Sequence, residues 1–337
     1  MRVSHDVPLA PLTTLGVGGA ASRVIDLDDE RELPDALREI GDGPLLVLGG
    51  GSNLVVRDAG FAGTVLRLAT TRVQIDAGRE DVVVDADAGV VWDDLVAQVV
   101  GERFTGVECL AGIPGLVGAT PMQNVGAYGQ EVGDVLDHVR AYDRELQRVV
   151  EIPKRDCELA YRHSKFRGST RWIILGVRLW LGRDYMATGI RYAELATALG
   201  IPEGHRAPPG EVRAAVLALR RGKGMVVDAA DPDTRSAGSF FTNPIIPTAI
   251  AMRLPPAVPR WPQPDGRVKL AAAWLIEHSG FAKGLARGHV GISTKHALAL
   301  VARPGATAGE LLALADDIRA AVRVSFGIDL AMEPVVV

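Results

Sequence analysis

Short runs of hydrophobic residues, bounded by glycine and polar residues, recur along the first 181 positions and predict β-strands. The runs lie at Arg23–Leu27, Leu45–Leu48, Leu54–Val56, Thr64–Leu68, Val73–Ile75, Val82–Asp87, Val135–Asp143, Leu146–Ile152 and Arg171–Leu181. Leu45–Leu48 and Leu54–Val56 are apolar throughout, which predicts buried strands. Near the C-terminus, Ile328–Val337 predicts a closing strand.

Apolar residues spaced three or four apart predict helices between and after these strands. The helical segments are Asp28–Ile40, Val90–Gly101, Tyr192–Leu199, Glu211–Arg221, Ala271–Ser279 and Thr307–Val324. The apolar side of the second is expected to be Val91, Leu95, Val96 and Val99. Thr307 and Glu310 form the sequence signature of a capping box. A composition shift near Gly222–Pro232 predicts a domain boundary.

A glycine-rich loop lies between the strands Leu45–Leu48 and Leu54–Val56. It consists of Gly49, Gly50, Gly51, Ser52 and Asn53. Glycine permits positive φ and lets a ligand approach the backbone, and successive N–H groups in such a turn bind anions. The loop therefore predicts a pyrophosphate site, although a plain hairpin turn is the alternative reading.

A second glycine-dense stretch, Glu108–Glu131, is poor in charge, which is unusual for a solvent loop. Its backbone donors and small side chains suit a flat, polar cofactor, and Ile113–Gly118 is a candidate short helix whose N-terminus faces an anion. Thr13–Ala21 contains the spacing Gly-x-Gly-x-x-Ala, but a dinucleotide fingerprint needs a strand before it and a helix after it. We therefore interpret that segment as a loop near a ligand.

Composition excludes several classes of protein. The 337 residues are 47% hydrophobic and 23% charged, with a net charge of −4, so nothing indicates a nucleic-acid-binding surface. Cys109 and Cys157 have no metal-binding spacing, no metal site is expected, and free thiols are favoured. Neither a signal peptide nor a membrane-spanning apolar run is evident, so a soluble cytoplasmic protein is expected.

Five motifs, in this order, resemble one family. They are GGGSNLV, IPGLVGATPMQNVGAYGQE, YRHSKFR, GSFFTNP and an acidic residue near the C-terminus. The chain resembles UDP-N-acetylenolpyruvoylglucosamine reductase, a bacterial flavoenzyme of peptidoglycan precursor synthesis, from about Thr13 to Glu333. The resemblance implies an α+β fold of the vanillyl-alcohol-oxidase type. It also implies non-covalent FAD, NADPH as hydride donor, and reduction of UDP-N-acetylglucosamine enolpyruvate to UDP-N-acetylmuramate.

The resemblance also assigns residues. It places the FAD pyrophosphate on Gly49–Asn53, and the flavin against Gly112, Ile113, Pro114, Gly115, Gly118, Ala119, Gln123, Asn124, Gly126, Ala127 and Tyr128. The implied catalytic set is Arg162, Ser239 and Glu333. Tyr192, which resembles the substrate-covering tyrosine of one branch, Lys223 and Asn243 are the implied substrate contacts. Thr242 departs from the family pattern because a basic residue is frequent there, and the tail after Glu333 is short.

The chemistry gives each catalytic residue a role. Arg162 can hold the substrate carboxylate bidentately and stabilise a developing enolate, Ser239 can supply a proton, and Glu333 can support the enolate from its other side. Without the resemblance, each would be a surface arginine, a serine at a strand start and a glutamate at a frayed end. Two other classes remain open, namely a flavin oxidase of the same fold and a non-catalytic nucleotide-sugar-binding protein.

The resemblance implies three parts and a small-molecule partner. The parts are an FAD-binding subdomain at 1–67 with 330–337, a second one at 68–224, and a substrate domain at 225–329. A monomer without nucleic-acid or membrane partners is expected.

Overall fold

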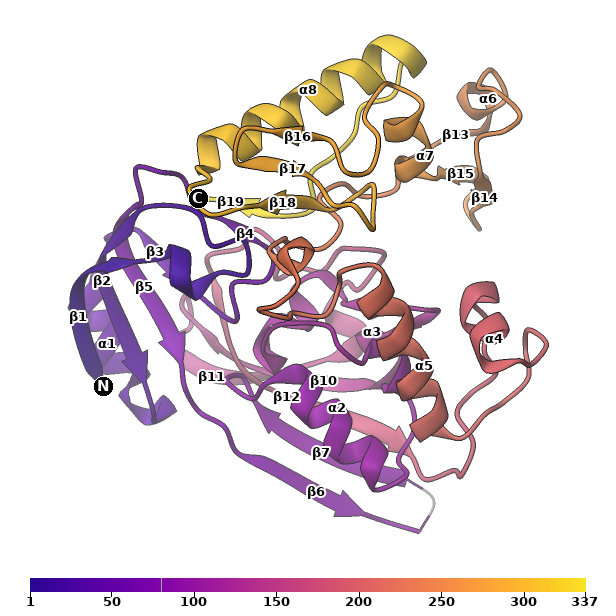
Figure 1. Cartoon of the computed structure of the whole chain (residues 1–337). Coiled ribbons are helices and arrows are strands. Elements are labelled where there is room, and N and C mark those ends of the chain that lie inside the picture. Colours follow the sequence, from indigo (N-terminus) through magenta and orange to yellow (C-terminus); the bar gives the residue numbers. More distant parts are fainter. Residues whose placement is uncertain (80) are drawn as a thin grey trace. The chain divides into compact units, whose positions relative to one another are not determined.

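The computed structural model describes residues 1–79 and 81–337, and the chain divides into two compact units (Figure 1). Unit 1 consists of Met1–Val7, Ala21–Gly50 and Ala62–Val226, and unit 2 of Pro8–Ala20, Gly51–Phe61 and Val227–Val337. The chain therefore passes from one unit to the other inside the glycine-rich loop. The predicted α+β class is confirmed, whereas the three-part division stays a prediction.

Unit 1 begins with a four-stranded sheet in the order β1-β2-β5-β3. Its elements are β1 (Arg2–Pro8), β2 (Ala20–Leu27), β3 (Leu45–Val47), β5 (Phe61–Leu68) and the helix α1 (Leu33–Ile40). Leu33 and Ala36 of α1 belong to one buried cluster with Ile25 and Leu66. The prediction that Leu45–Leu48 is a buried strand is wrong for most of its length. Because β3 is the edge strand, Val47 is 40% exposed.

The first helix starts later than the pattern predicted. Asp29 caps a short 3₁₀ turn at Glu30–Glu32 by accepting the N–H of Arg31 at 2.9 Å, and the α-helix begins at Leu33. Pro34 lies in the first turn, where a missing N–H breaks no helical hydrogen bond. The helix ends at Ile40, as predicted, and Gly41 follows it at a φ of +62°.

The second sheet of unit 1 has five antiparallel strands in the order β11-β10-β12-β7-β6. Its strands are β6 (Val73–Ala77), β7 (Asp81–Asp87), β10 (Leu136–Asp143), β11 (Arg148–Pro153) and β12 (Trp172–Gly182). The helices of this part are α2 (Trp92–Gly101), α3 (Val132–Val135), α4 (Ala193–Leu199) and α5 (Pro209–Gly222). Leu95, Val96 and Val99 of α2 are buried in the core, as predicted. Val91 is not, because it precedes the helix and is 46% exposed.

The predicted helix at Ile113–Gly118 is absent. Gly115 has a φ of +123°, outside the helical region, and only Val117–Ala119 form a 3₁₀ turn. The backbone instead bonds to neighbouring segments: Val117 donates its N–H to Val90 O at 2.8 Å. A small hairpin follows, made of β8 (Gly126–Ala127) and β9 (Gln130–Glu131).

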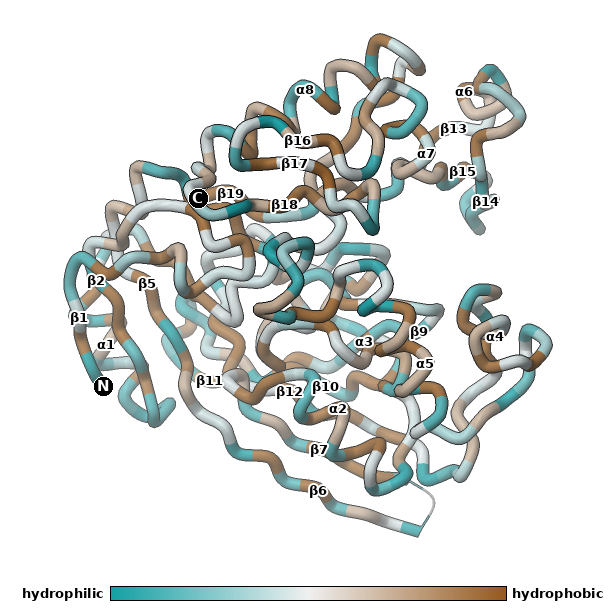
Figure 2. The backbone as a smooth tube through the Cα atoms, viewed as in Figure 1, coloured by the Kyte–Doolittle hydropathy of each residue, from teal (hydrophilic) through white to brown (hydrophobic). Residues whose placement is uncertain are grey.

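Unit 2 is built from short strands covered by one long helix. Its elements are β4 (Leu54–Val55), β13 (Ile245–Pro247), α6 (Thr248–Ala251), β14 (Arg260–Pro262), β15 (Arg267–Leu270), α7 (Ala272–Glu277), β16 (Ala286–Arg287), β17 (Val290–Ile292), β18 (Leu300–Ala302), α8 (Ala308–Phe326) and β19 (Val335–Val336). The sheets run β13-β15-β14 and β16-β17-β18. In Figure 2, hydrophobic and hydrophilic segments alternate along α8, which buries one face against β17 and β18.

The C-terminal strand is much shorter than predicted. Only β19 forms, and it pairs in parallel with β4, Leu54 opposite Val335. Before it, Met332 makes a single antiparallel bridge with Phe241. Pro334 has no N–H to donate, so a continuous ladder from Ile328 to Val337 is interrupted there.

Asp58 is expected to stabilise α8. Its Oδ1 accepts the N–H of Ala308 at 2.7 Å and its Oδ2 that of Gly309 at 2.8 Å, beside the predicted capping box of Thr307 and Glu310, which is confirmed. Replacing a capping side chain by alanine costs about 1 kcal/mol. We expect Asp58→Ala to lower the free energy of unfolding by about that amount in urea titrations. The control Glu277→Ala, at an exposed acid of the same unit, should change it less, and equal losses would contradict the assignment.

Candidate functional site

The first half of the glycine loop packs directly on the second glycine-rich stretch. A Cβ atom added to Gly50 would lie 2.7 Å from the Cα of Gly115, and one added to Gly49 would lie 3.4 Å from the Cβ of Ala119. Gly50 therefore has no room for a side chain. Within unit 1, the first half of the loop predicted to hold the pyrophosphate therefore lies beside the stretch predicted to contact the flavin.

The second half of the loop is constrained by a different segment. Gly51 has a φ of +62°, and a Cβ there would lie 2.1 Å from the carbonyl oxygen of Leu12. Thr14 donates its N–H to Gly51 O at 3.3 Å. The hairpin reading of this loop is wrong, because β3 pairs with β5 while β4 pairs with β19.

Hydrogen bonds hold the segment Gly112–Gly118 against α2 and against Ala88, the residue that follows β7. Gly112 donates its N–H to Asp93 Oδ1 at 2.7 Å, and Trp92 donates its own to Gly115 O at 3.0 Å. Gly118 donates to Ala88 O at 3.0 Å, and a Cβ at Gly118 would meet the Cβ of Ala88 at 2.6 Å. Ile113 and Pro114 are half-buried between these fixed points. The backbone conformation of Gly112–Gly118 is therefore fixed by its hydrogen bonds to neighbouring segments.

The stretch Gln123–Tyr128 combines a structural asparagine with a tight turn. Asn124 is buried at a φ of +46°, its Oδ1 accepts the N–H of Gly133 at 2.8 Å, and its Nδ2 donates to Glu131 Oε2 at 2.6 Å. These bonds occupy the side chain that the sequence had proposed for cofactor binding. Gln123, Gly126 and Ala127 are half-buried.

Arg162 lies in a tight turn of YRHSKFR, where Ala160 and His163 exchange backbone hydrogen bonds of 3.2 and 3.0 Å. Arg162 itself has a φ of +53°, and its Nη1 donates to Gly126 O at 3.3 Å. Ser164 Oγ donates to Met122 O at 2.7 Å. The motif is therefore fixed on the stretch that the sequence predicts to bind the cofactor, and Arg162 does not belong to a freely solvated strand face.

Two tyrosines and a lysine from three elements meet in unit 1. Tyr128, in the β8–β9 turn, has its ring 5.3 Å from that of Tyr192 in an edge-to-face arrangement. Lys223, which follows α5, has its Nζ 5.6 Å from the centre of the Tyr128 ring. Burial raises the pKa of Tyr128 to about 12, so the phenol remains protonated at neutral pH.

Two charged residues of this cluster were not predicted from the sequence. Glu194 Oε2 accepts a hydrogen bond of 2.5 Å from Lys223 Nζ. Arg220 lies on α5 beside Gly112 and donates to Met225 O at 2.9 Å, and burial lowers its pKa from the ordinary value. The interval of three between Arg220 and Lys223 was a usable signal, because residues three apart share a helix face.

In unit 2, chain pairing brings the segment that contains Ser239 next to the segment that contains Glu333. Glu333 is 7% exposed, and its N–H donates at 2.9 Å to the carbonyl of Phe240, the residue that follows Ser239. Asn53 Nδ2 donates to Glu333 O at 3.3 Å, so the end of the glycine loop reaches the same backbone. Asn243 Oδ1 accepts the N–H of Ala272 at 3.0 Å and thereby holds the start of α7.

Comparison with known proteins places this arrangement in a family. Residues 21–147 match the model described as FAD binding domain, and residues 231–337 match UDP-N-acetylenolpyruvoylglucosamine reductase, C-terminal domain. A UDP-N-acetylenolpyruvoylglucosamine reductase of Thermobifida fusca is 51% identical, over 99% of this chain and 98% of that protein. The chain belongs to the UDP-N-acetylenolpyruvoylglucosamine reductase family. The resemblance seen in the sequence is confirmed, and the chain is an FAD-binding oxidoreductase.

Further relatives of the reductase agree. The protein of the same name from Mycobacterium marinum is 46% identical, over 100% of this chain and 95% of that protein. The crystal structure of UDP-N-acetylenolpyruvylglucosamine reductase from Thermus caldophilus superposes with a TM-score of 0.70 at 27% identity, covering 100% of this chain and 99% of that one. The family assignment thus favours a reductase over the oxidase and non-catalytic alternatives.

The residues of the reductase suit FAD. The FAD-binding model spans the glycine loop and the stretch Gly112–Tyr128, and the backbones of these two stretches meet at Gly50 and Gly115 with no side chain between them. Glycine backbone of this kind admits a pyrophosphate against its N–H groups. The loop Gly49–Asn53 would hold the pyrophosphate, and bound FAD would supply hydride-transfer chemistry.

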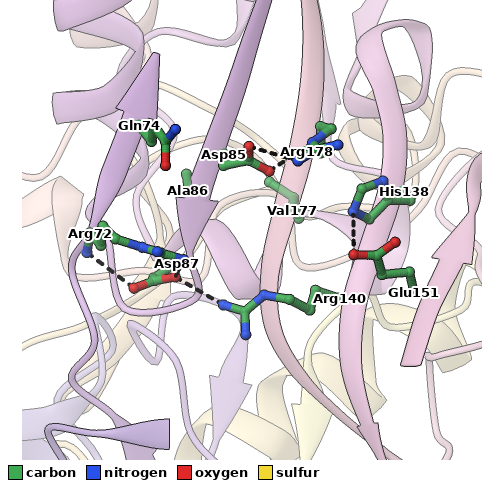
Figure 3. A pocket seen from close by; sticks show the side chains of 10 residues that line it. All are labelled: Arg72, Gln74, Asp85, Ala86, Asp87, His138, Arg140, Glu151, Val177 and Arg178. Carbon is green, nitrogen blue, oxygen red and sulfur yellow. Dashed lines mark hydrogen bonds and ion pairs between the residues drawn. The ribbon is translucent and has the colours of Figure 1, made fainter. Parts of the chain in front are cut away.

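A separate hollow of the reductase has other properties (Figure 3). It has a volume of about 300 Å³ on the five-stranded sheet, and its charged residues pair with one another. Arg178 Nε lies 2.8 Å from Asp85 Oδ1, and Arg140 Nη2 lies 2.9 Å from Asp87 Oδ1. It contains none of the predicted site residues, so we interpret it as an ion-paired sheet surface.

Both cysteines are free and buried, as expected. Burial raises the pKa of the Cys109 thiol to about 12 and that of Cys157 to about 11, which keeps both protonated at neutral pH. Within residues 1–79 and 81–337, no cluster of side chains suits a metal ion. In the same ranges, no helix is long and apolar enough to span a membrane.

Proposed function

We propose that this reductase converts UDP-N-acetylglucosamine enolpyruvate to UDP-N-acetylmuramate, with NADPH as the hydride donor, in peptidoglycan precursor synthesis. The carrying observation is the full-length match to relatives named for this reaction, 51% identical over 98% of the relative. In the net reaction, the substrate C=C bond gains a hydride at its methylene carbon and a proton at the carbon bearing the carboxylate. NADPH becomes NADP⁺.

Within this proposal, Arg162 holds the substrate carboxylate. Its guanidinium projects from a turn fixed by Ser164 and Ala160, and its bond to Gly126 O limits its freedom. A planar guanidinium donates two parallel hydrogen bonds to a carboxylate and stabilises the negative charge that develops when the hydride arrives. A group that is already oriented loses little conformational freedom on binding.

In the same proposal, Ser239 supplies the proton, and Glu333 supports the enolate from its other side. Two observations in unit 2 support these roles: Glu333 donates its N–H to the carbonyl of Phe240, the residue that follows Ser239, and Glu333 is 7% exposed. A serine hydroxyl can act as an acid when neighbouring polar groups stabilise the alkoxide that it leaves. Tyr192, Lys223 and Asn243 bind the nucleotide sugar in this proposal. Monomeric state and cytoplasmic location stay predictions.

The test is an anaerobic two-step assay of the purified holoenzyme. NADPH is expected to bleach the flavin absorbance, and the enolpyruvyl substrate is then expected to restore it in one equivalent, with UDP-N-acetylmuramate identified by mass spectrometry. Reoxidation that needs oxygen and ignores the substrate would instead indicate an oxidase. A protein with no flavin absorbance would indicate the non-catalytic alternative.

We expect Arg162→Lys to slow flavin reoxidation by substrate about 100-fold while flavin reduction by NADPH changes little. Lysine keeps the positive charge but lacks the planar fork that binds a carboxylate bidentately. The control is Arg167→Lys, because Arg167 donates to the carbonyl of Arg162 at 2.7 Å and tests whether the turn alone matters. An Arg162→Lys enzyme with parental reoxidation would remove the bidentate contact from the proposal.

A further inference from the structure

A partly exposed ion pair joins Glu194 and Lys223 in unit 1. Glu194 lies in the first turn of α4, Lys223 directly follows α5, and these two helices are in contact (Figure 1). Lys223 Nζ donates to Glu194 Oε2 at 2.5 Å, with the two side chains 30% and 41% exposed. The pair is therefore open to solvent and to a ligand.

The surroundings of the pair mark it as part of the proposed site. Lys223 Nζ lies 5.6 Å from the centre of the Tyr128 ring, and the Tyr192 ring packs on Tyr128 at 5.3 Å. Glu194 is two residues after Tyr192, and its charge also acts on the Tyr128 phenol. The carboxylate thus lies among the residues that the proposed function assigns to the nucleotide sugar.

A carboxylate in this position competes with a diphosphate. A lysine ammonium is a compact charge with three donors, and a bound carboxylate uses donor directions that phosphate oxygens would need. Glu194 also repels a second anion placed close by, and the repulsion is moderate because the pair is partly exposed. A diphosphate that binds Lys223 would therefore have to break the ion pair between Lys223 and Glu194.

We propose that Glu194 holds Lys223 as an internal counter-ion that the substrate diphosphate displaces, so that Glu194 sets the affinity for the nucleotide sugar. The inference rests on the proposed function, in which Lys223 binds the diphosphate. It adds a specificity-determining residue, because a ligand without a strong anion cannot displace the carboxylate. Replacing Glu194 with a neutral residue is therefore expected to improve the binding of the nucleotide sugar.

The test uses calorimetry to measure the binding of substrate to the oxidised holoenzyme in the absence of NADPH. Exposed ion pairs contribute up to about 1 kcal/mol, so Glu194→Gln is expected to lower the Kd of UDP-N-acetylglucosamine enolpyruvate about three- to fivefold at low salt. The gain should shrink in 0.5 M salt, because screening weakens both the pair and the repulsion. The control Glu203→Gln, an exposed acid of the same unit, should leave the Kd unchanged.

A double-mutant cycle isolates the role of Lys223. Lys223→Met is expected to raise the Kd, and Glu194→Gln in that background should give less than half of its gain in the parent, because the competing pair no longer exists. An unchanged or higher Kd in Glu194→Gln overturns the inference, as does an equal gain in both backgrounds. A parent holoenzyme that does not bind the nucleotide sugar would overturn the proposed function itself, and the inference with it.

Discussion

Replacing Ser239 with alanine is expected to leave NADPH-dependent flavin reduction within about twofold of the parent and to slow reoxidation by substrate about 10²–10⁴-fold, the usual loss when a general acid is removed. Only the second half-reaction needs a proton at the substrate carbon. The substitution deletes one oxygen atom. The backbone there is held by bonds that do not involve the hydroxyl, from Phe240 N–H to Leu298 O at 2.7 Å and from Glu333 N–H to Phe240 O at 2.9 Å.

Stopped-flow absorbance of the flavin under anaerobic conditions measures each half-reaction separately. The matched control is Ser279→Ala, which removes a hydroxyl of the same unit that donates to Ile276 O at 3.0 Å. Both half-reactions should remain near the parental rates in the control. Equal slowing of the two steps in Ser239→Ala would show a general disturbance of the enzyme and would refute the proton-donor role.

Replacing Gly50 with aspartate is expected to abolish stable FAD binding. Any side chain there starts with a Cβ only 2.7 Å from the Cα of Gly115, so the backbone of one segment must move. The change would also add a negative charge to the loop that is predicted to hold the pyrophosphate, and two like charges about 4 Å apart repel by about 4 kcal/mol at an effective dielectric constant of 20. The steric conflict and the charge repulsion together are expected to lower the affinity for FAD by about 100-fold or more.

The flavin-to-protein absorbance ratio after purification and fluorescence titration of the apoprotein with FAD measure this loss without turnover. Gly50→Ala separates the two causes, since it adds the steric conflict but no charge, and it should fall between the parent and Gly50→Asp. The control Gly210→Asp adds a carboxylate in the first turn of α5, where no atom lies within 4 Å of a Cβ. A Gly50→Asp protein that retains stoichiometric FAD would exclude this loop from the pyrophosphate site.

Local sequence determined the elements whose cause is local. The capping box at Thr307 predicts the start of α8 because both partners lie within four residues. Hydrophobic runs predict β7, β10 and β12, because the apolar side chains that form the runs are the ones that these strands bury. The three glycines of GGGSN predicted a backbone that is free of side chains at these positions, and the contact of Gly50 with Gly115 shows which neighbour requires a glycine there.

Tertiary structure decided which strands pair and which charges meet. The sequence left a hairpin as the alternative reading of the glycine loop, but β3 pairs with β5 and β4 with β19. Residues distant in sequence give no local signal for such pairing. The same holds for the backbone hydrogen bond between Phe240 and Glu333, and for the ion pair between Glu194 of α4 and Lys223, which follows α5. Sequence therefore supplied the chemical groups of the reductase, whereas long-range packing determined their partners, because burial and pairing energies depend on contacts between distant segments.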